Sequence, residues 1–372
     1  MTKILFFIHD LMHGGAEKVL VNLVNNMDYN QFDITVMTLF NEGVHIKNLN
    51  KNIKYKYCFD KAFKGNSKIL AMMPAKWLYK KFIKDDYDIL VSYLEGSCTR
   101  IIAACPYDKV KKVAWVHIEQ TENGFAYAYK SKNEAIESYK KFHNIVCVSE
   151  SVKQNFIELS GIDKNVKVLF NTNESEKIKK LSKEEITNEK FKSDNELKLC
   201  GVAKVLPNKG FMRLAKVHNK LIKEGYKHHI YILGIGEERK KIEAYLSENG
   251  LEDSFIFLGF DENPYKYVAR SDMFVCSSFA EGFSTAATEA LIVGTPVLTT
   301  LCAGMEEMLG KNNEYGIIVE NSEEGLYKGL KDVLQNPDKI SYYKEKAEER
   351  GKIFSTSKTV NAVQDMFLNL LK

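Results

Sequence analysis

The segment 281–296 carries the residue pattern best suited to chemistry in this sequence of 372 residues. The pattern predicts a turn, a helix and the start of a buried strand. Glu281 precedes the expected helix, and Glu289 follows eight positions later inside it. Carboxylates placed in this way can accept hydrogen bonds from the hydroxyls of a ligand that lies across the helix. A phosphorylated sugar offers such hydroxyls together with an anionic group.

The start of this helix is the expected place for the anionic group. Ser284 is the predicted N-cap residue. The N–H groups of the first turn, at 284–286, have no acceptor inside the helix and lie at the positive end of its dipole, so they can face a phosphate. Gly294 and Pro296 are expected to end the helix. Ordinary burial explains the alanine-rich helix itself, so the ligand interpretation depends on the two glutamates.

Two further turns could bring the backbone close to a ligand. A strand that ends at His9 leads into Gly14 and Gly15, whose missing side chains allow a close approach before a helix starts. Gly236 lies in a turn, 234–236, that lacks the third glycine of G-x-G-x-x-G, and the sequence contains no Walker A motif. Dinucleotide binding therefore has little support.

Basic groups follow two of the expected strands. Lys204 and Lys209 lie on the loop after the strand that opens the second half of the chain. Such lysines are usually solvated, but opposite a helix N-terminus they suit the role of counter-charges to a diphosphate. His117 follows an apolar strand at the end where ligands meet parallel sheets. A hydrogen-bonded core histidine is the alternative interpretation.

The composition is that of a soluble globular protein, with 45% hydrophobic and 27% charged residues. A net charge of +4 is too small to indicate nucleic-acid binding. No apolar run is long enough to span a membrane, and the N-terminal apolar stretch predicts a strand and not a signal peptide. Seven cysteines without a C-x-x-C pair favour neither a zinc site nor disulfides. We therefore expect a cytoplasmic protein.

Short apolar runs alternate with amphipathic helices along the whole chain, which predicts an α/β fold with parallel sheets. We expect two Rossmann-like domains, at 1–172 and 197–356, that face each other across a cleft. The polar segment 173–196 is the predicted linker, which carries a short solvated helix. The last segment, 357–372, is predicted to be a helix that packs back on the first domain. Since ligands bind at the carboxyl ends of parallel strands, the cleft is the expected active site.

The segment 61–84 contains lysines and no acidic residue. In its helical part Lys76, Lys80 and Lys84 form one stripe and Leu78 and Phe82 lie on another. A basic amphipathic helix of this kind can lie on an anionic membrane surface. An ordinary surface helix of a Rossmann-like domain has the same pattern, so both interpretations stay open.

Together these segments resemble the family 4 retaining glycosyltransferases, which use nucleotide sugars and have the two-domain GT-B architecture. The resemblance rests on the stretches 13–17, 203–210, 234–236 and 257–259, and above all on the glutamate spacing in 281–296. It covers nearly the whole chain. The last motif is specific, while the others are weak singly but match in order and separation.

The resemblance implies a role for each candidate residue. Lys209, and Lys204 where relatives usually have arginine, would neutralise the donor diphosphate. Glu281 would bind hydroxyls of the transferred sugar, and His117 would touch that sugar from the first domain. The residues implied in binding the nucleotide or its phosphates are Gly14, Gly15, Gly236, Gly259, Phe283, Ser284, Thr285 and Glu289, the last through the ribose hydroxyls.

The expected reaction transfers a hexosyl group, with retention, from a nucleotide diphosphate sugar such as a UDP-sugar to a hydroxyl of a glycan or lipid-linked acceptor. We expect neither a cofactor nor a divalent metal, because lysines and the helix dipole supply the positive charge. Surface polysaccharide or glycolipid synthesis, with the enzyme peripheral on the inner face of the cell membrane, fits the basic segment 61–84. The alternatives are a nucleotide-sugar epimerase or dehydrogenase, and a catalytically silent sugar-nucleotide-binding partner.

Overall fold

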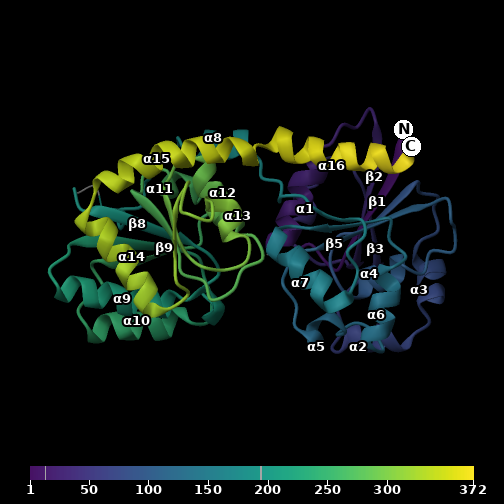
Figure 1. The fold of residues 1–372 in the computed structure, drawn as a ribbon, viewed down its shortest axis with the longest axis horizontal. Helices are drawn as coiled ribbons and strands as arrows, with labels where there is room; N and C mark the ends of the chain where they lie inside the picture. The colour runs from purple at the N-terminus through teal and green to yellow at the C-terminus, as the bar shows by residue number, and fades with distance from the viewer. Residues whose placement is uncertain (13, 193–194) are drawn as a thin grey trace. The chain divides into compact units, whose positions relative to one another are not determined.

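The computed structural model describes residues 1–12, 14–192 and 195–372 (Figure 1). They form two compact units. Unit 1 comprises Met1–Asn173 and Thr356–Lys372, and unit 2 comprises Glu174–Ser355. Each unit is an α/β domain built around its own parallel sheet, as the alternation of apolar runs and helices predicts.

Unit 1 contains a seven-stranded sheet with the strand order β3-β2-β1-β4-β5-β6-β7. The central strand β1 pairs in parallel with β2 and with β4, so its residues from Ile4 to Ile8 are buried on both faces. The strands are β1 (Thr2–Ile8), β2 (Phe32–Phe40), β3 (Lys54–Phe59), β4 (Ile89–Ser92), β5 (Lys111–Val116), β6 (Asn144–Cys147) and β7 (Val166–Val168).

The helices of unit 1 follow the strands in α/β fashion. They are α1 (Gly15–Asn25), η1 (Ile46–Asn48), α2 (Asn66–Met72), α3 (Ala75–Phe82), α4 (Ser97–Ile102), α5 (Glu122–Phe125), α6 (Lys132–Tyr139), α7 (Glu150–Ser160) and the C-terminal α16 (Thr356–Leu371). The segment 61–84, predicted as one amphipathic helical stretch, contains the two short helices α2 and α3. Pro74, which lies between them and has no N–H to donate, explains the break.

The C-terminal helix α16 packs on unit 1, which confirms the prediction (Figure 1). Its Phe367 ring lies edge-on to Phe6 of β1, with 5.9 Å between ring centroids, and also contacts Phe32 and Trp115. Gln364 accepts a hydrogen bond from the N–H of Asp28. The last residues of the chain therefore complete the core of the domain that its first residues begin.

Unit 2 contains a six-stranded sheet with the order β10-β9-β8-β11-β12-β13. The strands are β8 (Leu197–Val202), β9 (His228–Leu233), β10 (Phe255–Gly259), β11 (Met273–Cys276), β12 (Val297–Thr300) and β13 (Ile317–Val319). The helices are α8 (Ser175–Leu181), η2 (Pro207–Lys209), α9 (Phe211–Lys223), α10 (Arg239–Glu248), α11 (Tyr265–Val268), α12 (Thr285–Ile292), α13 (Met305–Leu309), α14 (Glu323–Gln335), α15 (Asp338–Gly351) and η3 (Lys352–Phe354).

The strand order places a topological switch point in each sheet. In unit 2 it lies between β8 and β11, the two central strands whose connections run to opposite edges. Ligands of doubly wound sheets bind outside the carboxyl ends of the strands at such a point. The loops after β8 and β11 are therefore the parts of unit 2 to search for a site.

Two features of the fold differ from the sequence predictions. The edge strand β3 was not predicted, because its sequence alternates lysine and tyrosine and most of its side chains are only partly buried. The segment 173–196, predicted as a linker that carries a short solvated helix, contains the short helix α8, but α8 packs against α11 and α12 of unit 2. Among the described residues, no helix combines the length and the apolar character that crossing a membrane requires.

Candidate active site

The loop after β8 is anchored so that it lies against the end of β11. The N–H of Val205 donates to the carbonyl of Ile235, and η2 then ends at Gly210, which has a φ of +68°. A side chain at Gly210 would collide with the carbonyl of Ser277, just after β11, and would be strained at this φ. Lys204, by contrast, is exposed on this loop.

Lys209, the last residue of η2, forms an ion pair with Glu281. The distance between its Nζ and Oε1 of Glu281 is 2.7 Å, and the two side chains are 22% and 13% exposed. The hydroxyl of Ser278 donates to the same carboxylate oxygen at 2.5 Å, and the hydroxyl of Ser277 donates to the carbonyl of Lys209 at 2.9 Å. Two residues to which the resemblance gives different ligands are thus bonded to each other in this structure.

The buried guanidinium of Arg213 in α9 holds the turn that leads to Glu281. Its Nε and Nη2 donate to the carbonyl of Ser277 at 2.9 and 2.7 Å, and Nη2 donates to the carbonyl of Ser278 at 2.7 Å. The guanidinium also lies 3.9 Å from the ring centroid of Phe279. Burial lowers the pKa of Arg213, but an arginine stays protonated at neutral pH. The turn after β11 is therefore a rigid support for Glu281.

Helix α12 begins as the sequence predicts. Ser284 is its N-cap residue, and its hydroxyl accepts a hydrogen bond from the N–H of Ala287 at 3.3 Å. This cap leaves the N–H groups of Thr285 and Ala286 without an acceptor inside the helix. The preceding residue, Phe283, is buried against the ring of Phe354. The helix start is thus fixed in place and offers two donors to an anion.

Glu289 lies in the second turn of α12 and is only 6% exposed. The hydroxyl of Tyr265, from α11, donates to its Oε1 at 3.3 Å. A buried carboxylate is costly unless its oxygens are hydrogen-bonded. The structure thus places Glu289 on the same helix as the predicted phosphate donors, about one turn further along.

The glycines of the other two motifs are explained first by packing between loops. A side chain at Gly234 or Gly236 would overlap main-chain atoms of Ala203 or Val205, on the loop after β8. Gly259 has a φ of +82°, and its carbonyl accepts a hydrogen bond from the N–H of Gly234 at 2.7 Å. The predicted contact of Gly236 and Gly259 with a nucleotide stays a prediction.

In unit 1, His117 lies just after the carboxyl end of β5 and is buried. Its ring packs against the ring of Tyr93, with centroids 5.0 Å apart, and the carbonyl of Tyr93 is a hydrogen-bond partner of the imidazole. Burial lowers the pKa of His117 to about 4, so the ring is neutral at pH 7. Its buried Nε2 has no hydrogen-bond partner among the described residues.

Glu95, on the loop after β4, holds the backbone next to this histidine. Its Oε1 accepts hydrogen bonds from the N–H groups of His117 at 2.5 Å and Ile118 at 3.3 Å. Burial raises the pKa of Glu95. Neither Glu95 nor Arg213 was identified in the sequence. The available signal was position alone, since Glu95 follows the strand 89–92 at the end where ligands bind.

The first glycine motif lies at the start of α1. Gly14 is the N-cap residue, and a side chain there would overlap the carboxylate of Glu17, which folds back on the helix start. A Cβ atom at Gly15 would meet no atom of the described chain within 4 Å. Gly15 is therefore the glycine of this pair with open space beside it. His13, part of the same motif, lies outside the described residues.

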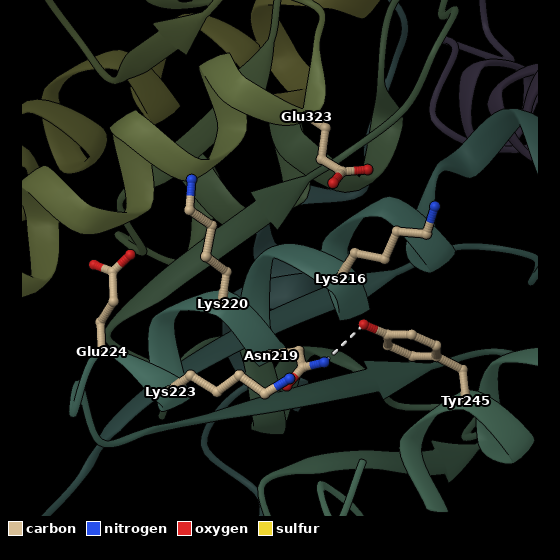
Figure 2. Close-up of a pocket in the computed structure, with 7 residues that line it drawn as sticks. All are labelled: Lys216, Asn219, Lys220, Lys223, Glu224, Tyr245 and Glu323. Carbon is tan, nitrogen blue, oxygen red and sulfur yellow. Dashed lines mark hydrogen bonds between the residues drawn. The ribbon is translucent and has the colours of Figure 1, made fainter. Parts of the chain in front are cut away.

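A hollow of about 500 Å³ lies beside α9 (Figure 2). Three lysines of α9, Glu224 just after α9 and Glu323 of α14 line it, and the amide of Asn219 donates to the hydroxyl of Tyr245 at 2.9 Å. Its lining contains none of the predicted site residues. The side chains that line it carry charges of both signs, so no particular ligand is indicated.

Comparisons with known proteins distinguish a glycosyltransferase from a nucleotide-sugar epimerase or dehydrogenase. The family model described as "Glycosyltransferase Family 4" matches residues 13–172, and the model described as "Glycosyl transferases group 1" matches residues 182–350. The chain belongs to glycosyltransferase family 4. Family 4 membership rules against the epimerase and dehydrogenase readings and places the candidate site in a glycosyltransferase.

A relative with a named transferase activity is similar along nearly the whole chain. It is the N-acetylgalactosamine-N,N'-diacetylbacillosaminyl-diphospho-undecaprenol 4-alpha-N-acetylgalactosaminyltransferase of Campylobacter jejuni. The two sequences are 26% identical over 375 aligned residues, which cover 96% of this chain and 97% of the relative.

Solved structures confirm the GT-B fold predicted for a family 4 chain. HepE of Anabaena, in complex with UDP, has a TM-score of 0.79 and 16% sequence identity, with 99% of this chain and 100% of HepE covered. A glycosyltransferase from Rickettsia africae has a TM-score of 0.78 and 17% identity, with 100% and 99% covered. At these identities the likeness establishes the fold and no more.

Proposed function

We propose that the chain is a retaining glycosyltransferase that moves a hexosyl group from a UDP-sugar to a hydroxyl of a glycan or lipid-linked acceptor. The observation that carries this proposal is the Lys209–Glu281 ion pair at the end of β11, four residues before the capped start of α12. It joins an ammonium group from the loop after β8 to a carboxylate that lies just before two helix N–H donors. A sugar diphosphate needs groups of these three kinds.

The ion pair is compatible with both roles that the resemblance implies. An ammonium group has three N–H donors, so Lys209 can keep one on Glu281 and offer another to a phosphate oxygen. Glu281 receives Lys209 and Ser278 on Oε1, which leaves Oε2 for a sugar hydroxyl. We assign Lys209, with the N–H groups of Thr285 and Ala286, to the diphosphate. Glu281 is assigned to the transferred sugar.

The remaining candidates receive supporting roles. Glu289 would accept hydrogen bonds from the ribose hydroxyls, and Lys204 would add a second, more exposed positive charge near the diphosphate. His117 would accept a hydrogen bond from a hydroxyl of a glycosyl substrate, because its buried Nε2 lacks a partner among the described residues. Gly15 would allow a close approach at the start of α1.

The proposed chemistry depends on stabilising the leaving group. The bond between the anomeric carbon and the diphosphate oxygen breaks, and its electron pair stays on that oxygen. The acceptor oxygen attacks the same face of the sugar, and its proton passes to the departing phosphate. Lys204, Lys209 and the start of α12 would stabilise the negative charge that develops there, which is usually the largest catalytic contribution.

The identity of the donor and acceptor is supported by relatives. HepE was crystallised with UDP, with UDP and glucose, and with UDP-glucose. The Campylobacter relative's name specifies an undecaprenol-linked acceptor and an α linkage. Retention of configuration at an α-linked donor gives an α product. We therefore propose a UDP-sugar donor, a lipid-linked acceptor and a pathway of surface polysaccharide or glycolipid synthesis.

A lipid-linked acceptor lies in a membrane, so binding of the basic segment 61–84 to the membrane surface would bring the enzyme to its acceptor. Met72 and Trp77 of α2 and α3 are 70% and 47% exposed, and lysines flank them. Apolar side chains surrounded by cationic ones suit the surface of an anionic membrane. We propose that this segment binds the membrane; flotation with anionic liposomes at low salt should carry the protein, and absence of binding would leave only the surface-helix interpretation.

Binding and turnover test the proposal together. Ligands that bind the native state raise its melting temperature, so a panel of UDP, GDP, ADP and their sugars should show the largest shifts with UDP compounds. Transfer to a lipid-linked glycan should then give a product with the donor's anomeric configuration and should persist in the presence of chelator. A product of inverted configuration, or loss of activity with chelator, would contradict the mechanism. Binding without either transfer or slow donor hydrolysis would indicate a silent partner.

A further inference from the structure

The loops after β4 and β5 of unit 1 are tied together by one side chain, that of Glu95. Its Oε1 receives the N–H groups of His117 and Ile118, at 2.5 and 3.3 Å. Glu95 itself is mostly buried and is followed by Gly96, which has a φ of +93° and starts α4. Two amide hydrogen bonds to one buried oxygen fix the main chain at His117 more firmly than the strand end alone would.

The imidazole of His117 is also held in place by Tyr93, the residue that follows the neighbouring strand β4. Tyr93 contributes the ring against which the imidazole packs and the carbonyl to which it is hydrogen-bonded. A neutral imidazole has one N–H donor and one acceptor nitrogen, and the carbonyl of Tyr93 can only accept. The donor is therefore committed to Tyr93, and the unpartnered Nε2 is the acceptor.

An acceptor nitrogen selects the group that it binds. It can receive the O–H of a sugar hydroxyl or an amide N–H, but it has no proton to give to a carboxylate or a phosphate. The direction in which Nε2 points is set by the backbone of His117, because the side chain is short and its ring is packed against Tyr93. Anything that moves this stretch of backbone therefore moves the acceptor.

We propose that Glu95 is a positioning residue for His117, which aims the Nε2 atom at a hydroxyl of the glycosyl substrate. This inference rests on the proposed function, since that function supplies the hydroxyl. The side chain acts through two main-chain hydrogen bonds and not through contact with substrate. Its geometry matters more than its charge, because an amide oxygen at the same place accepts the same hydrogen bonds.

Four variants test whether Glu95 acts through His117. Glu95→Ala should lower kcat/KM by roughly tenfold or more. Glu95→Asp, which keeps the charge but is one methylene shorter, should be similarly impaired, while Glu95→Gln should retain most of the activity. In the His117→Ala background, Glu95→Ala should cost less than about twofold more, because coupled residues are not additive. Equal losses in both backgrounds, or Glu95→Asp outperforming Glu95→Gln, would overturn the proposal.

A matched control separates this effect from a change in folding. Glu122, five residues after His117, is an exposed carboxylate that pairs with Lys132. Glu122→Ala should match the wild type in melting temperature and in kcat/KM. If Glu95→Ala does not fold, the comparison of Glu95→Asp with Glu95→Gln decides the matter. Glu95→Asp keeps the charge and shortens the side chain, whereas Glu95→Gln keeps the length and removes the charge.

A second measurement needs no enzymatic activity. NMR of protein labelled with ¹⁵N-histidine, with His117→Ala to assign the signal, should show His117 titrating near pH 4 in the wild type. In Glu95→Ala its pKa should rise toward the ordinary value of about 6.5 as water reaches the ring. Removing a carboxylate would by itself lower a histidine pKa, so a rise reports solvent entry. An unchanged titration would contradict the positioning role.

The two measurements distinguish the possible failures. A wild-type protein that transfers no sugar, yet shows the NMR shift, would refute the proposed function and keep the positioning of His117. A wild-type protein that transfers sugar while Glu95→Ala keeps full kcat/KM would refute the positioning role and keep the function.

Discussion

At the carboxyl end of the sheet in unit 2, charged side chains are bonded to each other or to the main chain. At the corresponding end of the sheet in unit 1, the imidazole of His117 is neutral. In unit 2, Lys209 and Glu281 form an ion pair, and Arg213 holds the carbonyls of the turn before Glu281. In unit 1, burial keeps His117 uncharged, and its Nε2 has no partner within the described chain. The difference shows two ways to prepare a binding site. In unit 2 the charged side chains are held by hydrogen bonds before a charged ligand binds. In unit 1 a single acceptor atom, held in a fixed direction, is enough to bind a hydroxyl group.

The largest effect should come from Glu281. Glu281→Ala removes the carboxylate that receives Lys209 and Ser278, and with it the proposed contact with the sugar. We expect kcat/KM to fall by about 10²–10³-fold, the cost of losing one preorganised electrostatic group. UDP affinity, measured by calorimetry, should change far less. An equal loss in UDP binding and in sugar transfer would contradict the assignment of Glu281 to the sugar.

Replacing Arg213 should have the next largest effect, and this effect should appear in the free energy of unfolding of unit 2. Arg213→Met leaves the buried carbonyls of Ser277 and Ser278 short of donors, which should cost about 3 kcal/mol. For a domain the size of unit 2 this corresponds to a fall of roughly 6–12 °C in melting temperature. Arg239→Met is the control, because the Arg239 side chain is 34% exposed and forms an ion pair with Glu243 one turn away on α10. Similar melting of the two variants would show that the turn does not depend on Arg213.

The two units should also respond differently to acid. In unit 2, Nδ1 of His218 lies 2.8 Å from Nε2 of His228, and burial lowers the pKa of His218 to about 2 and that of His228 to about 4. Above about pH 7.5 both residues are almost entirely uncharged, in the folded chain and in the unfolded chain. As the pH falls below about 6.5 the unfolded chain takes up protons first, so stability is lost, by about 1.4 kcal/mol per histidine at pH 5.5.

In unit 1 the pKa shifts of the histidines oppose each other: the pKa is lowered for His117 and, by partial burial and nearby lysines, for His143, but it is raised for His9. His117 behaves like the pair in unit 2. For His9 burial alone would lower the pKa, but the hydrogen bond and charge of Asp10 raise it above its usual value. Its contribution is therefore present below about pH 6.5 and lost as the pH rises through the raised pKa. Calorimetry at pH 7.5 and 5.5 should show unit 2 losing more stability than unit 1, and His228→Asn should flatten the response of unit 2. Equal loss in both units would contradict this account.

Lys204 should give the smallest effect. It is exposed, so solvent screens its charge, and Lys204→Ala should lower kcat/KM by less than about tenfold. Lys209→Ala should cost at least about tenfold, because Lys209 is mostly buried and fixed by Glu281. Lys204→Arg, which places a planar guanidinium with several donors at this position, should keep or improve activity. A larger loss at Lys204 than at Lys209 would reverse the proposed order of the two lysines.

Local rules predicted the parts of the site that depend on short spacings. The capped start of α12 follows from Ser284 and its neighbours three residues away, and the strands of both sheets follow from their apolar runs. The edge strand β3 was missed because its exposed Lys–Tyr alternation lacks such a run.

Residues that act over long sequence distances could not be predicted in the same way. Glu95 bonds the backbone 22 residues further on, and Arg213 bonds a carbonyl 64 residues further on. The pairing of Lys209 with Glu281 spans 72 residues. No spacing rule connects such positions, because only the order of the strands in the sheet brings them together.

The most direct test of the central claim is a crystal structure of the protein with its UDP-sugar. We predict that the diphosphate will contact the ammonium group of Lys209 and the N–H groups of Thr285 and Ala286, and that a hydroxyl of the sugar will donate to Glu281. Density for the donor elsewhere on the chain, or a bound sugar that does not touch Glu281, would contradict the account.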